Sequence, residues 1–347
     1  MYTTWPHPII TSRRAGRFAP TPTGHLHIGN AYSALLSLIS ARAQGLAHFV
    51  RVDDLDTARV AAHNYTNQQL EELDWLGIEF DEGLSAGGVA EPYNQAARSG
   101  HYEEALRALN RRGLLYPCYC TRREIVAAAP HAHDEGYVYP LTCRPSTPSP
   151  IDLAEVRSTP RNGRLPSIRL NTGALKNSLE WTEGSKSPQE LNPRVTQYQD
   201  LVFGLQYAHL DHEIGDFVLQ RSDGVYGYQL ACAVDDYLQG CALVARGADL
   251  ITSTHRQRLI LAALGARPEL TPRYAHAGLV VDAQGERLAK RNRSLSLAGL
   301  RESGVSPARL RASLSRALGG PDTDQLAEMV KTFQWSQVSR EPVSWSL

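Results

Sequence analysis

The stretch RFAPTPTGHLHIGNAYSALLSLISARAQGLAHFVRVDD, residues 17–54, decides the fold. A short strand is predicted to end at residues 14–18, and the spacing of apolar residues predicts a helix over 30–44. The helix should end at Gly45, where glycine adopts a left-handed cap at little cost. AHFVRVDD then alternates apolar and polar residues as a strand does. A strand, a helix and a second strand in this order indicate a parallel crossover, the opening unit of a doubly wound α/β sheet.

The rest of the chain alternates regular and irregular stretches. Helices are predicted over 61–76 and 101–112, and DFVLQRSDGVYGYQLACAVDD reads as a strand, a turn and a further helix or strand. Residues 117–150 are rich in proline, and 171–195 are polar and turn-rich, which indicates an insertion with a surface excursion. The predicted organisation is the first half of an α/β domain over 1–116, an insertion over 117–195, the second half over 196–294 and a short helical part over 295–347.

The composition is that of an ordinary globular protein. Of 347 residues 42% are hydrophobic, and 36 basic residues balance 36 acidic ones, so nucleic-acid binding would have to come from local basic patches. The sequence has no run of about 18 apolar residues, and its N-terminus lacks the pattern of a signal peptide. Five cysteines, an odd number, argue against a fully paired disulfide framework. We therefore expect a cytoplasmic protein with no membrane association.

The loop between the first strand and its helix has the features of a phosphate-binding site. Open α/β sheets bind ligands there, because the helix N-terminus offers unpaired N–H groups and a partial positive charge. The loop contains neither G-x-G-x-x-G nor G-x-x-x-x-G-K-[ST]. It carries His25 and His27, whose imidazoles can donate to phosphate oxygens, and Gly29, which lets the backbone approach closely. Pro20 and Pro22 fix the path of the loop.

The motif P-T-G-x-L-H-x-G, from Pro22 to Gly29, resembles the HIGH signature of class I aminoacyl-tRNA synthetases, in particular of their glutamyl/glutaminyl branch. The resemblance implies a Rossmann-type catalytic domain that binds ATP together with Mg²⁺. It implies that His27 and Lys290 are catalytic and that ATP contacts Pro20, Thr21, His27, Gly29, Asn30 and Lys290. From the residues alone, the alternative is a proline-rich loop with two solvated histidines.

Residues 287–291, RLAKR, resemble K-M-S-K-S, the second signature of these enzymes. Lys290 matches the lysine that stabilises negative charge developing on the ATP phosphates. Arg287 replaces the first lysine conservatively, whereas Ala289 lacks the serine hydroxyl. Such a pentapeptide is by itself an ordinary basic loop. Its position behind the apolar strand predicted over 278–281, long after the first signature, favours the catalytic interpretation.

Between the two signatures lie residues similar to the amino-acid pocket of the family. Arg17 and Arg246 match arginines that hold substrate carboxylates, a task suited to the planar guanidinium fork. Tyr228 matches a pocket tyrosine. RVDDLD resembles R-x-E-D-x-D, which puts Asp53, one methylene shorter, at the glutamate that binds the substrate ammonium. VDDYLQG also matches the family, although its two aspartates can equally brace the sheet edge. The implied glutamate site is Arg17, Phe18, Ala19, Pro20, Thr21, Asp53, Tyr228 and Arg246.

Three cysteines in the insertion indicate a metal site. Cys118-x-Cys120 and Tyr139-x-x-x-Cys143 resemble the zinc site of shortened paralogues in this branch, which lack an anticodon-binding domain. Three thiolates and a phenolate oxygen imply a closed tetrahedral site that is structural, with no open position for chemistry. His131 and His133 lie between the cysteines and are the alternative fourth ligands, since imidazole is the commoner partner. A reduced cluster of thiols without metal is the remaining alternative.

The stretch after residue 294 is too short for an anticodon-reading domain, which needs on the order of 100 to 200 residues. The resemblance to the shortened paralogues therefore implies ATP-dependent activation of L-glutamate and transfer of the glutamyl group to queuosine. This modified base occupies the anticodon wobble position of tRNA(Asp). The resemblance also implies a monomer. Basic residues that can hold the tRNA are Arg111, Arg112, Arg122 and Arg123, which can equally be solvated charges at helix ends.

Three other functions fit parts of the same pattern. The first is a truncated glutamyl-tRNA synthetase that charges the 3′ end of tRNA(Glu). The second is a HIGH-type ligase or nucleotidyltransferase that acts on a small molecule. The third is a tRNA-binding module with a decayed active site, which the departures at Asp53 and Ala289 would explain. Two arginines suited to carboxylates favour an amino acid over other small molecules.

Overall fold

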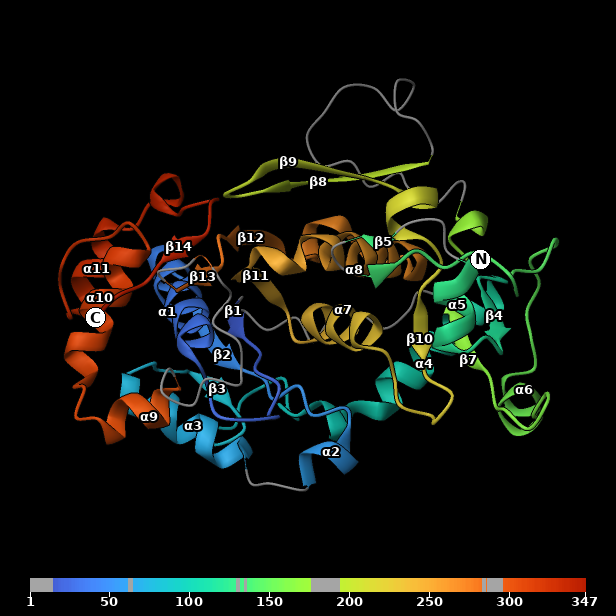
Figure 1. Ribbon diagram of the computed structural model, residues 1–347, viewed down its shortest axis with the longest axis horizontal. Coiled ribbons are helices and arrows are strands. Elements are labelled where there is room, and N and C mark those ends of the chain that lie inside the picture. The colour runs from blue at the N-terminus through green and yellow to red at the C-terminus, as the bar shows by residue number, and fades with distance from the viewer. Residues whose placement is uncertain are drawn as a thin grey trace.

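The computed structural model describes residues 15–61, 65–128, 132–133, 136–175, 194–282, 285 and 296–347. Its centre is a seven-stranded sheet in the order β3-β2-β1-β11-β12-β8-β9 (Figure 1). Neighbouring strands are parallel except β8 and β9, an antiparallel pair at one edge. The strands are β1 (Ala15–Phe18), β2 (Ala47–Val50), β3 (Glu82–Gly83), β8 (Val195–Asp200), β9 (Gly204–His209), β11 (Cys241–Gly247) and β12 (Arg273–Ala277).

The predicted strand–helix–strand crossover is confirmed. β1 and β2 pair in parallel, and helix α1 (Ile28–Ala43) connects them. The helix begins two residues before the predicted start, because the side chain of Asn30 reaches back and accepts a hydrogen bond from the His27 N–H at 3.0 Å. The chain leaves the helix through Gly45, whose φ of 67° is the left-handed conformation expected there.

Helices lie on both sides of the main sheet. On one side α1 packs with α3 (Tyr65–Leu76), α10 (Pro307–Ala317) and α11 (Leu326–Thr332). On the other side α7 (Tyr228–Leu238) and α8 (Ile251–Leu264) contact β11 and β8, and α4 (Ser99–Arg111) packs against both helices. Successive side chains along a strand point to opposite faces of the sheet, so each strand contributes to the hydrophobic core on both faces. Val50 and Ala245 face the α1 side, while Phe49 and Val244 face away from it. The fold is therefore of the α/β class.

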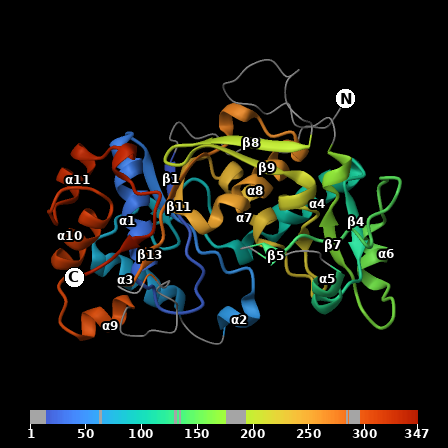
Figure 2. The same cartoon turned by 45° about the horizontal axis from the view of Figure 1, so that its top comes forward.

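A smaller antiparallel sheet in the order β10-β7-β4 lies at the opposite end of the molecule from the C-terminal helices (Figures 1 and 2). Asp216 ties this sheet to its connecting loops. It accepts hydrogen bonds from Tyr116 Oη at 2.7 Å, Arg144 Nε at 2.7 Å and the Thr172 N–H at 2.8 Å. The elements of this end are β4 (Leu115–Cys118), α5 (Arg122–Ala128), β5 (Ala132–His133), β6 (Gly136–Tyr137), α6 (Leu153–Ser158), β7 (Ser167–Leu170) and β10 (Val218–Gln220).

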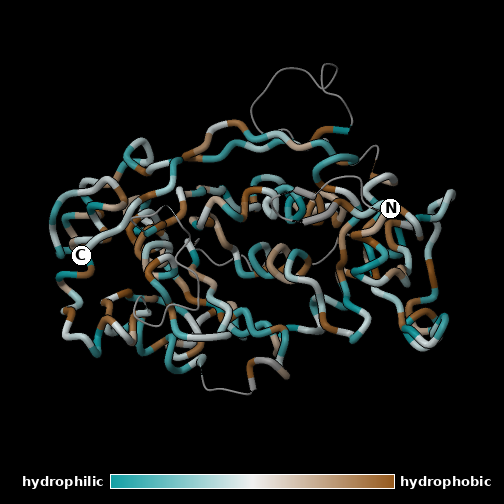
Figure 3. Tube along the Cα trace, in the orientation of Figure 1, coloured by the Kyte–Doolittle hydropathy of each residue, from teal (hydrophilic) through white to brown (hydrophobic). Residues whose placement is uncertain are grey.

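Further short helices and strands of the described chain are α2 (Thr57–Ala61), β13 (Val280–Val281), α9 (Leu297–Glu302) and β14 (Val343–Ser344). Figure 3 shows hydrophobic positions interleaved with hydrophilic ones along most elements, as expected of elements with one buried side. Among the residues that the structure describes, no helix combines the length and the apolar character needed to cross a membrane.

A buried network of ion pairs joins β1, β2 and α7. Arg51, which has no exposed side-chain surface, donates to Asp53 Oδ1 at 2.7 Å and to Asp236 Oδ1 at 2.6 Å. Asp236 also accepts from Nε and Nη2 of Arg17 at 3.1 and 3.0 Å. Burial alone would raise the pKa of the Asp236 carboxyl, but Arg17 and Arg51 hold this pKa at about 2.

The network continues through Asp235, the other aspartate of VDDYLQG. Its carboxylate accepts from Arg98 Nε at 2.5 Å, from Tyr102 Oη at 2.7 Å and from Gln95 Nε2 at 3.0 Å. Arg98 and Tyr102 thereby anchor α7 to the start of α4. Both aspartates of this segment are buried and paired with buried arginines, as expected of residues that brace the structure.

Removing Arg51 should strongly destabilise the fold. We expect Arg51→Met to lower the free energy of unfolding by about 3–5 kcal/mol in urea titrations, because it leaves Asp53 without its main countercharge and takes one of two arginines from Asp236. The matched control is Arg107→Met, which removes a largely exposed partner of Glu103 and should cost less than about 1 kcal/mol. Equal losses in the two variants would contradict the network's role.

Candidate functional site

A pocket of about 580 Å³ opens where β1 and β11 end and α1 begins. β1 and β11 are parallel neighbours, so their carboxyl ends bring Arg17 and Arg246 to the same edge of the sheet. The start of α1 contributes His27, Gly29 and Asn30. The other predicted site residues in the wall are Phe18, Ala19, Pro20, Thr21 and Tyr228.

Arg17 is anchored along one edge of its guanidinium group. Nε and Nη2 form the two bonds to Asp236 described above, and within the described part of the chain Nη1 makes no hydrogen bond. Because Arg17 lines the pocket, Nη1 is the group left for an anionic ligand.

Arg246 is also held from behind, but by neutral partners. Nη2 donates to Thr254 Oγ1 at 2.7 Å and to Gln257 Oε1 at 2.9 Å, and Nε donates to His276 Nε2 at 3.2 Å. Nη1 lies 3.5 Å from Tyr228 Oη, at the pocket wall. Among the described residues no carboxylate pairs with Arg246, although its side chain is buried. A buried cation without a countercharge favours an anionic ligand in the pocket.

Helix α3 fixes the polar loop in front of α1. Gln69 Nε2 donates to the carbonyl oxygen of Gly24 at 2.6 Å. Glu72 accepts from the Leu26 N–H at 2.8 Å and contacts His25 Nδ1 at 2.5 Å. Burial raises the pKa of the Glu72 carboxyl. Helix α3 therefore fixes the imidazole of His25, which lines the pocket.

Gly29 is needed where the chain enters α1. A Cβ atom at this position would lie 2.9 Å from Cε1 of the His27 ring, closer than carbon atoms approach without a shift. The absence of a side chain therefore lets the His27 imidazole lie against the first turn of α1. This arrangement puts a ring N–H and the N-terminal backbone N–H groups at the same pocket wall.

Asp53 does not line the pocket. Its Oδ1 accepts from Arg51 at 2.7 Å, and its Oδ2 accepts from the Cys232 thiol at 3.3 Å. Burial raises the pKa of the Asp53 carboxyl, while Arg51 and Arg17 act against this rise. The short side chain thus ends in the buried ion network, behind the wall that Arg17 and Tyr228 form.

Lys290, with Arg287 and Ala289, lies outside the described residues. The described chain before this segment lines the pocket, and the chain after it contacts the loop in front of α1. Gly278, Leu279 and Val280 line the pocket, and the Leu297 N–H donates to the Leu26 carbonyl oxygen at 2.8 Å. The predicted catalytic role of Lys290 remains a prediction.

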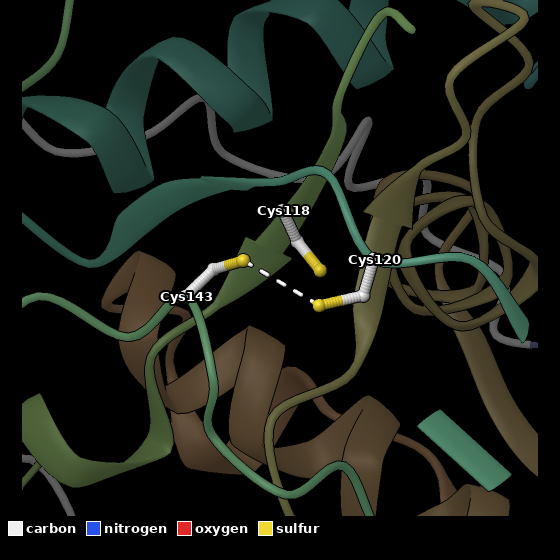
Figure 4. Close-up of side chains that lie close together, drawn as sticks. All are labelled: Cys118, Cys120 and Cys143. Carbon is white, nitrogen blue, oxygen red and sulfur yellow. Dashed lines mark hydrogen bonds between the residues drawn. The ribbon is translucent and has the colours of Figure 1, made fainter. Parts of the chain in front are cut away.

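The three predicted cysteines come together at the end of β4 (Figure 4). The sulfur atoms of Cys118, Cys120 and Cys143 all lie within 4.8 Å of one another, and those of Cys120 and Cys143 are 3.6 Å apart. A tetrahedral zinc ion with Zn–S bonds of about 2.3 Å separates its sulfur ligands by roughly 3.8 Å. The cluster can therefore hold a metal ion.

Tyr139 points its hydroxyl into this cluster. Its Oη is 3.3 Å from Cys118 Sγ and 3.6 Å from Cys120 Sγ, and accepts from the Cys143 N–H at 2.9 Å. The guanidinium carbon of Arg169 lies 3.8 Å from the centre of the Tyr139 ring. Such distances suit a fourth ligand oxygen. His131 and the side chain of His133 lie outside the described part of the chain.

The four arginines proposed for tRNA binding do not form one cluster on a single element. Arg111 and Arg112 are exposed at the end of α4, and the Arg112 guanidinium donates to the Ala263 carbonyl oxygen. Arg122 and Arg123 are exposed at the start of α5, next to the cysteine cluster. Their position on the surface is compatible with phosphate contacts.

Several pocket residues were not expected from the sequence. Gln69 and Asp249 line the pocket, and Asp200 and His276 stand behind Arg246. Only Asp249 carried a local signal, because it lies three residues after Arg246 within the segment VARGADL. The others reach the site from distant elements.

Three buried histidines are held neutral. Burial lowers the pKa of His48 to about 4 and that of His255 to about 3, and it also lowers the pKa of His276. His276 Nδ1 lies 2.6 Å from Asp200 Oδ2. Burial would raise the pKa of the Asp200 carboxyl, but hydrogen bonds from His276 and from backbone N–H groups lower it.

Comparisons with known proteins agree with these features. The family model for tRNA synthetases class I (E and Q), catalytic domain, matches residues 15–344. The Glutamyl-Q tRNA(Asp) synthetase of Symbiobacterium thermophilum is 40% identical over 335 residues, which cover 94% of this chain and 94% of that protein. Glutamate–tRNA ligase 2 of Alkalilimnicola ehrlichii is 38% identical over 322 residues, which cover 92% of this chain and 61% of the ligase.

A solved structure supports the fold. The crystal structure of a glutamate tRNA ligase from Elizabethkingia meningosepticum, in complex with its amino acid, aligns with a TM-score of 0.74 at 24% identity. The alignment covers 96% of this chain and 67% of that ligase. At this identity the likeness concerns the fold alone.

The buried histidines predict loss of stability in acid. Because the unfolded chain binds protons near pH 6.5 while the folded chain does not, stability should fall as pH drops below about 6.5, by about 1.4 kcal/mol per pH unit for each such histidine. His255→Phe conserves the ring packed against Tyr198 and removes one titrating group. In urea titrations between about pH 6.5 and 4.5, the free energy of unfolding of this variant should fall less steeply with decreasing pH, by the equivalent of about one bound proton. If the free energy of unfolding depended on pH in the same way in both proteins, burial would not be what lowers the pKa of His255.

Proposed function

The chain belongs to the class I tRNA synthetase family specific for glutamate and glutamine, and from this premise we propose that it is an ATP-dependent ligase that transfers a glutamyl group to queuosine. The acceptor is the modified base at the wobble position of tRNA(Asp). The observation that carries the proposal is the 40% identity, across 94% of both chains, to a protein named for this reaction. ATP and tRNA are both cytoplasmic, which is where we expect the protein to act as a monomer.

The pocket offers one set of groups for each part of glutamate. Among the described residues neither Nη1 of Arg17 nor Nη1 of Arg246, which donates to Tyr228 Oη, has a carboxylate partner, so we propose that these two groups bind carboxylate oxygens of the substrate. The backbone from Phe18 to Thr21 forms the adjoining wall. Asp53 is our proposed partner for the substrate ammonium. Since its oxygens accept from Arg51 and Cys232, we propose that a water molecule carries this contact.

The first step joins glutamate to AMP. A carboxylate oxygen attacks the α-phosphorus of ATP and pyrophosphate leaves, so negative charge develops on the phosphate oxygens. His27, the backbone N–H groups at the start of α1 and Lys290 are the groups we propose to stabilise this charge, with Pro20, Thr21, Gly29 and Asn30 around the nucleotide. Mg²⁺ bound to ATP would supply further positive charge.

The second step transfers the acyl group. A hydroxyl of the queuosine diol attacks the glutamyl carbonyl carbon, an ester forms and AMP leaves. Arg111, Arg112, Arg122 and Arg123 remain our proposed contacts to the tRNA backbone, so binding should weaken with added salt. The rival acceptor is the 3′ end of tRNA(Glu), which the 38% identity to a glutamate–tRNA ligase supports.

The acceptor distinguishes the two proposals. We expect labelled glutamate to enter tRNA(Asp) that contains queuosine, and not tRNA(Asp) without it or tRNA(Glu). Mild periodate destroys the queuosine diol and should abolish incorporation. Lys290→Ala should lower the rate by about 10²-fold or more, because it removes one cation from the developing charge. Incorporation into tRNA lacking queuosine would favour the charging reaction.

The cysteine cluster fits a structural zinc ion. We propose that Cys118, Cys120, Cys143 and Tyr139 are its four ligands, since the sulfur and oxygen atoms lie at tetrahedral ligand spacing. Four protein ligands leave no position for a substrate, so zinc would stabilise this end of the protein and take no part in the reaction.

Zinc content tests this ligand set without reference to activity. Purified protein should contain one zinc per chain, and Cys120→Ser should lose most of it and melt at a lower temperature. Tyr139→Phe should bind zinc more weakly, whereas the control His133→Ala should not. Loss of zinc from His133→Ala with retention in Tyr139→Phe would identify the histidine as the fourth ligand and contradict our assignment.

A further inference from the structure

Behind the pocket, Arg246 is one end of a chain of buried polar groups that crosses three strands. Arg246 on β11 and His276 on β12 are direct neighbours in the parallel register, and Arg246 Nε lies 3.2 Å from His276 Nε2. His276 Nδ1 lies 2.6 Å from Oδ2 of Asp200, the last residue of β8, the next strand along. The side chains of His276 and Asp200 have no exposed surface.

The donors and acceptors in this chain admit one arrangement of protons. A guanidinium N–H can only donate, so His276 Nε2 must accept from Arg246. The ring proton of the neutral imidazole is then on Nδ1, where Asp200 Oδ2 accepts it. Thr254 Oγ1, 3.1 Å from Nε2, accepts from Arg246 Nη2 and is 3.2 Å from the Leu250 carbonyl oxygen, to which it can donate.

Asp200 is itself fixed in orientation. Its Oδ1 accepts from the backbone N–H groups of Val202 and Phe203, both at 2.9 Å, and from that of His276 at 3.2 Å. With Oδ1 occupied in this way, Oδ2 is the oxygen turned toward the imidazole. The carboxylate cannot exchange its two oxygens without breaking three backbone hydrogen bonds.

We propose that Asp200 and His276 are positioning residues for Arg246: Asp200 selects the imidazole tautomer whose Nε2 accepts from Arg246, and this turns Nη1 of Arg246 toward the substrate carboxylate. The proposal rests on the proposed function, because it assumes that glutamate is the ligand of Arg246. Nothing in it requires either residue to touch the substrate.

The charge balance explains why an indirect arrangement is useful. An aspartate paired directly with Arg246 would compete with the substrate carboxylate for the same N–H groups. With an imidazole between them, Asp200 places its negative charge near the guanidinium, while Nη1, which donates to Tyr228 Oη at 3.5 Å, has no carboxylate partner among the described residues. Burial also keeps the pKa of His276 low, so the ring stays neutral and can accept.

Asp200→Asn tests the tautomer directly. Because three backbone N–H groups hold the Oδ1 position, the asparagine oxygen would occupy it and the amide NH₂ would face His276 Nδ1. The ring proton would then move to Nε2, where it opposes the Arg246 N–H. In glutamate-dependent exchange of pyrophosphate into ATP, we expect KM for glutamate to rise about 10-fold or more, with KM for ATP and kcat changed less than about threefold.

Variants at His276 provide the second test. His276→Phe removes the acceptor and should raise KM for glutamate at least as much, whereas His276→Gln, whose side-chain oxygen can accept from Arg246, should restore part of the affinity. The matched control is His255→Phe, another buried histidine on the neighbouring α8, which packs against Tyr198 and makes no bond to Arg246. It should leave KM for glutamate unchanged within about twofold.

The outcomes separate this inference from the proposed function. If the unmodified protein exchanges pyrophosphate with no amino acid, or with one other than glutamate, the proposed function fails. If glutamate supports exchange but Asp200→Asn and His276→Phe bind it as well as His255→Phe does, the positioning role is overturned. Equal losses in glutamate and ATP affinity would also overturn it, because they would indicate a general structural defect.

Discussion

Arg51 has to be neutralised in the interior of the protein, and much of the structure is arranged around that requirement. A buried guanidinium without countercharge would cost several kcal/mol, so β2 can carry Arg51 only where acidic groups meet it. Asp53 comes from the same segment, while Asp236 comes from α7. Because Asp236 also holds Arg17, the carboxylate that neutralises Arg51 orients a pocket residue as well. The packing of α7 beneath the sheet and the chemistry of the pocket are therefore linked through one side chain.

The two pocket arginines are stabilised in different ways, and the difference sets the charge of the site. Arg17 has a carboxylate partner, whereas Arg246 has neutral partners and a carboxylate one imidazole further away. Asp249 also lines the wall but is exposed, so water screens its charge. The two buried charged side chains that line the described part of the pocket are thus both arginines, which suits a ligand that carries carboxylates.

Local sequence was sufficient for the features that lie within one loop and its helix. The crossover from β1 through α1 to β2, the glycine caps and the three clustered cysteines come from short patterns with a direct physical meaning, whereas the pocket residues between Arg17 and Asn30 came from the resemblance to a family signature. The start of α1 differed by two residues, because the Asn30 side chain caps the backbone in a way that hydrophobic spacing does not report. Two predicted roles, that of Asp53 toward the substrate ammonium and that of Lys290 toward ATP, depend on where the side chains lie in space, which local sequence does not report. Asp53 ends in the ion network, and Lys290 lies outside the described residues.

Apart from Asp249, the residues that escaped prediction share one property: each contacts the site from an element far away in the chain. Gln69 holds the loop from α3, and Asp200 and His276 reach Arg246 from two neighbouring strands. Nothing adjacent to these residues in sequence marks them, since a buried histidine or aspartate is most often only a satisfied core polar group. Parallel strand order is what gives them their role, because it aligns the carboxyl ends of β8, β12 and β11 at one edge. A carboxylate at the end of one strand can therefore orient a guanidinium two strands away, and this relation exists only once the sheet has formed.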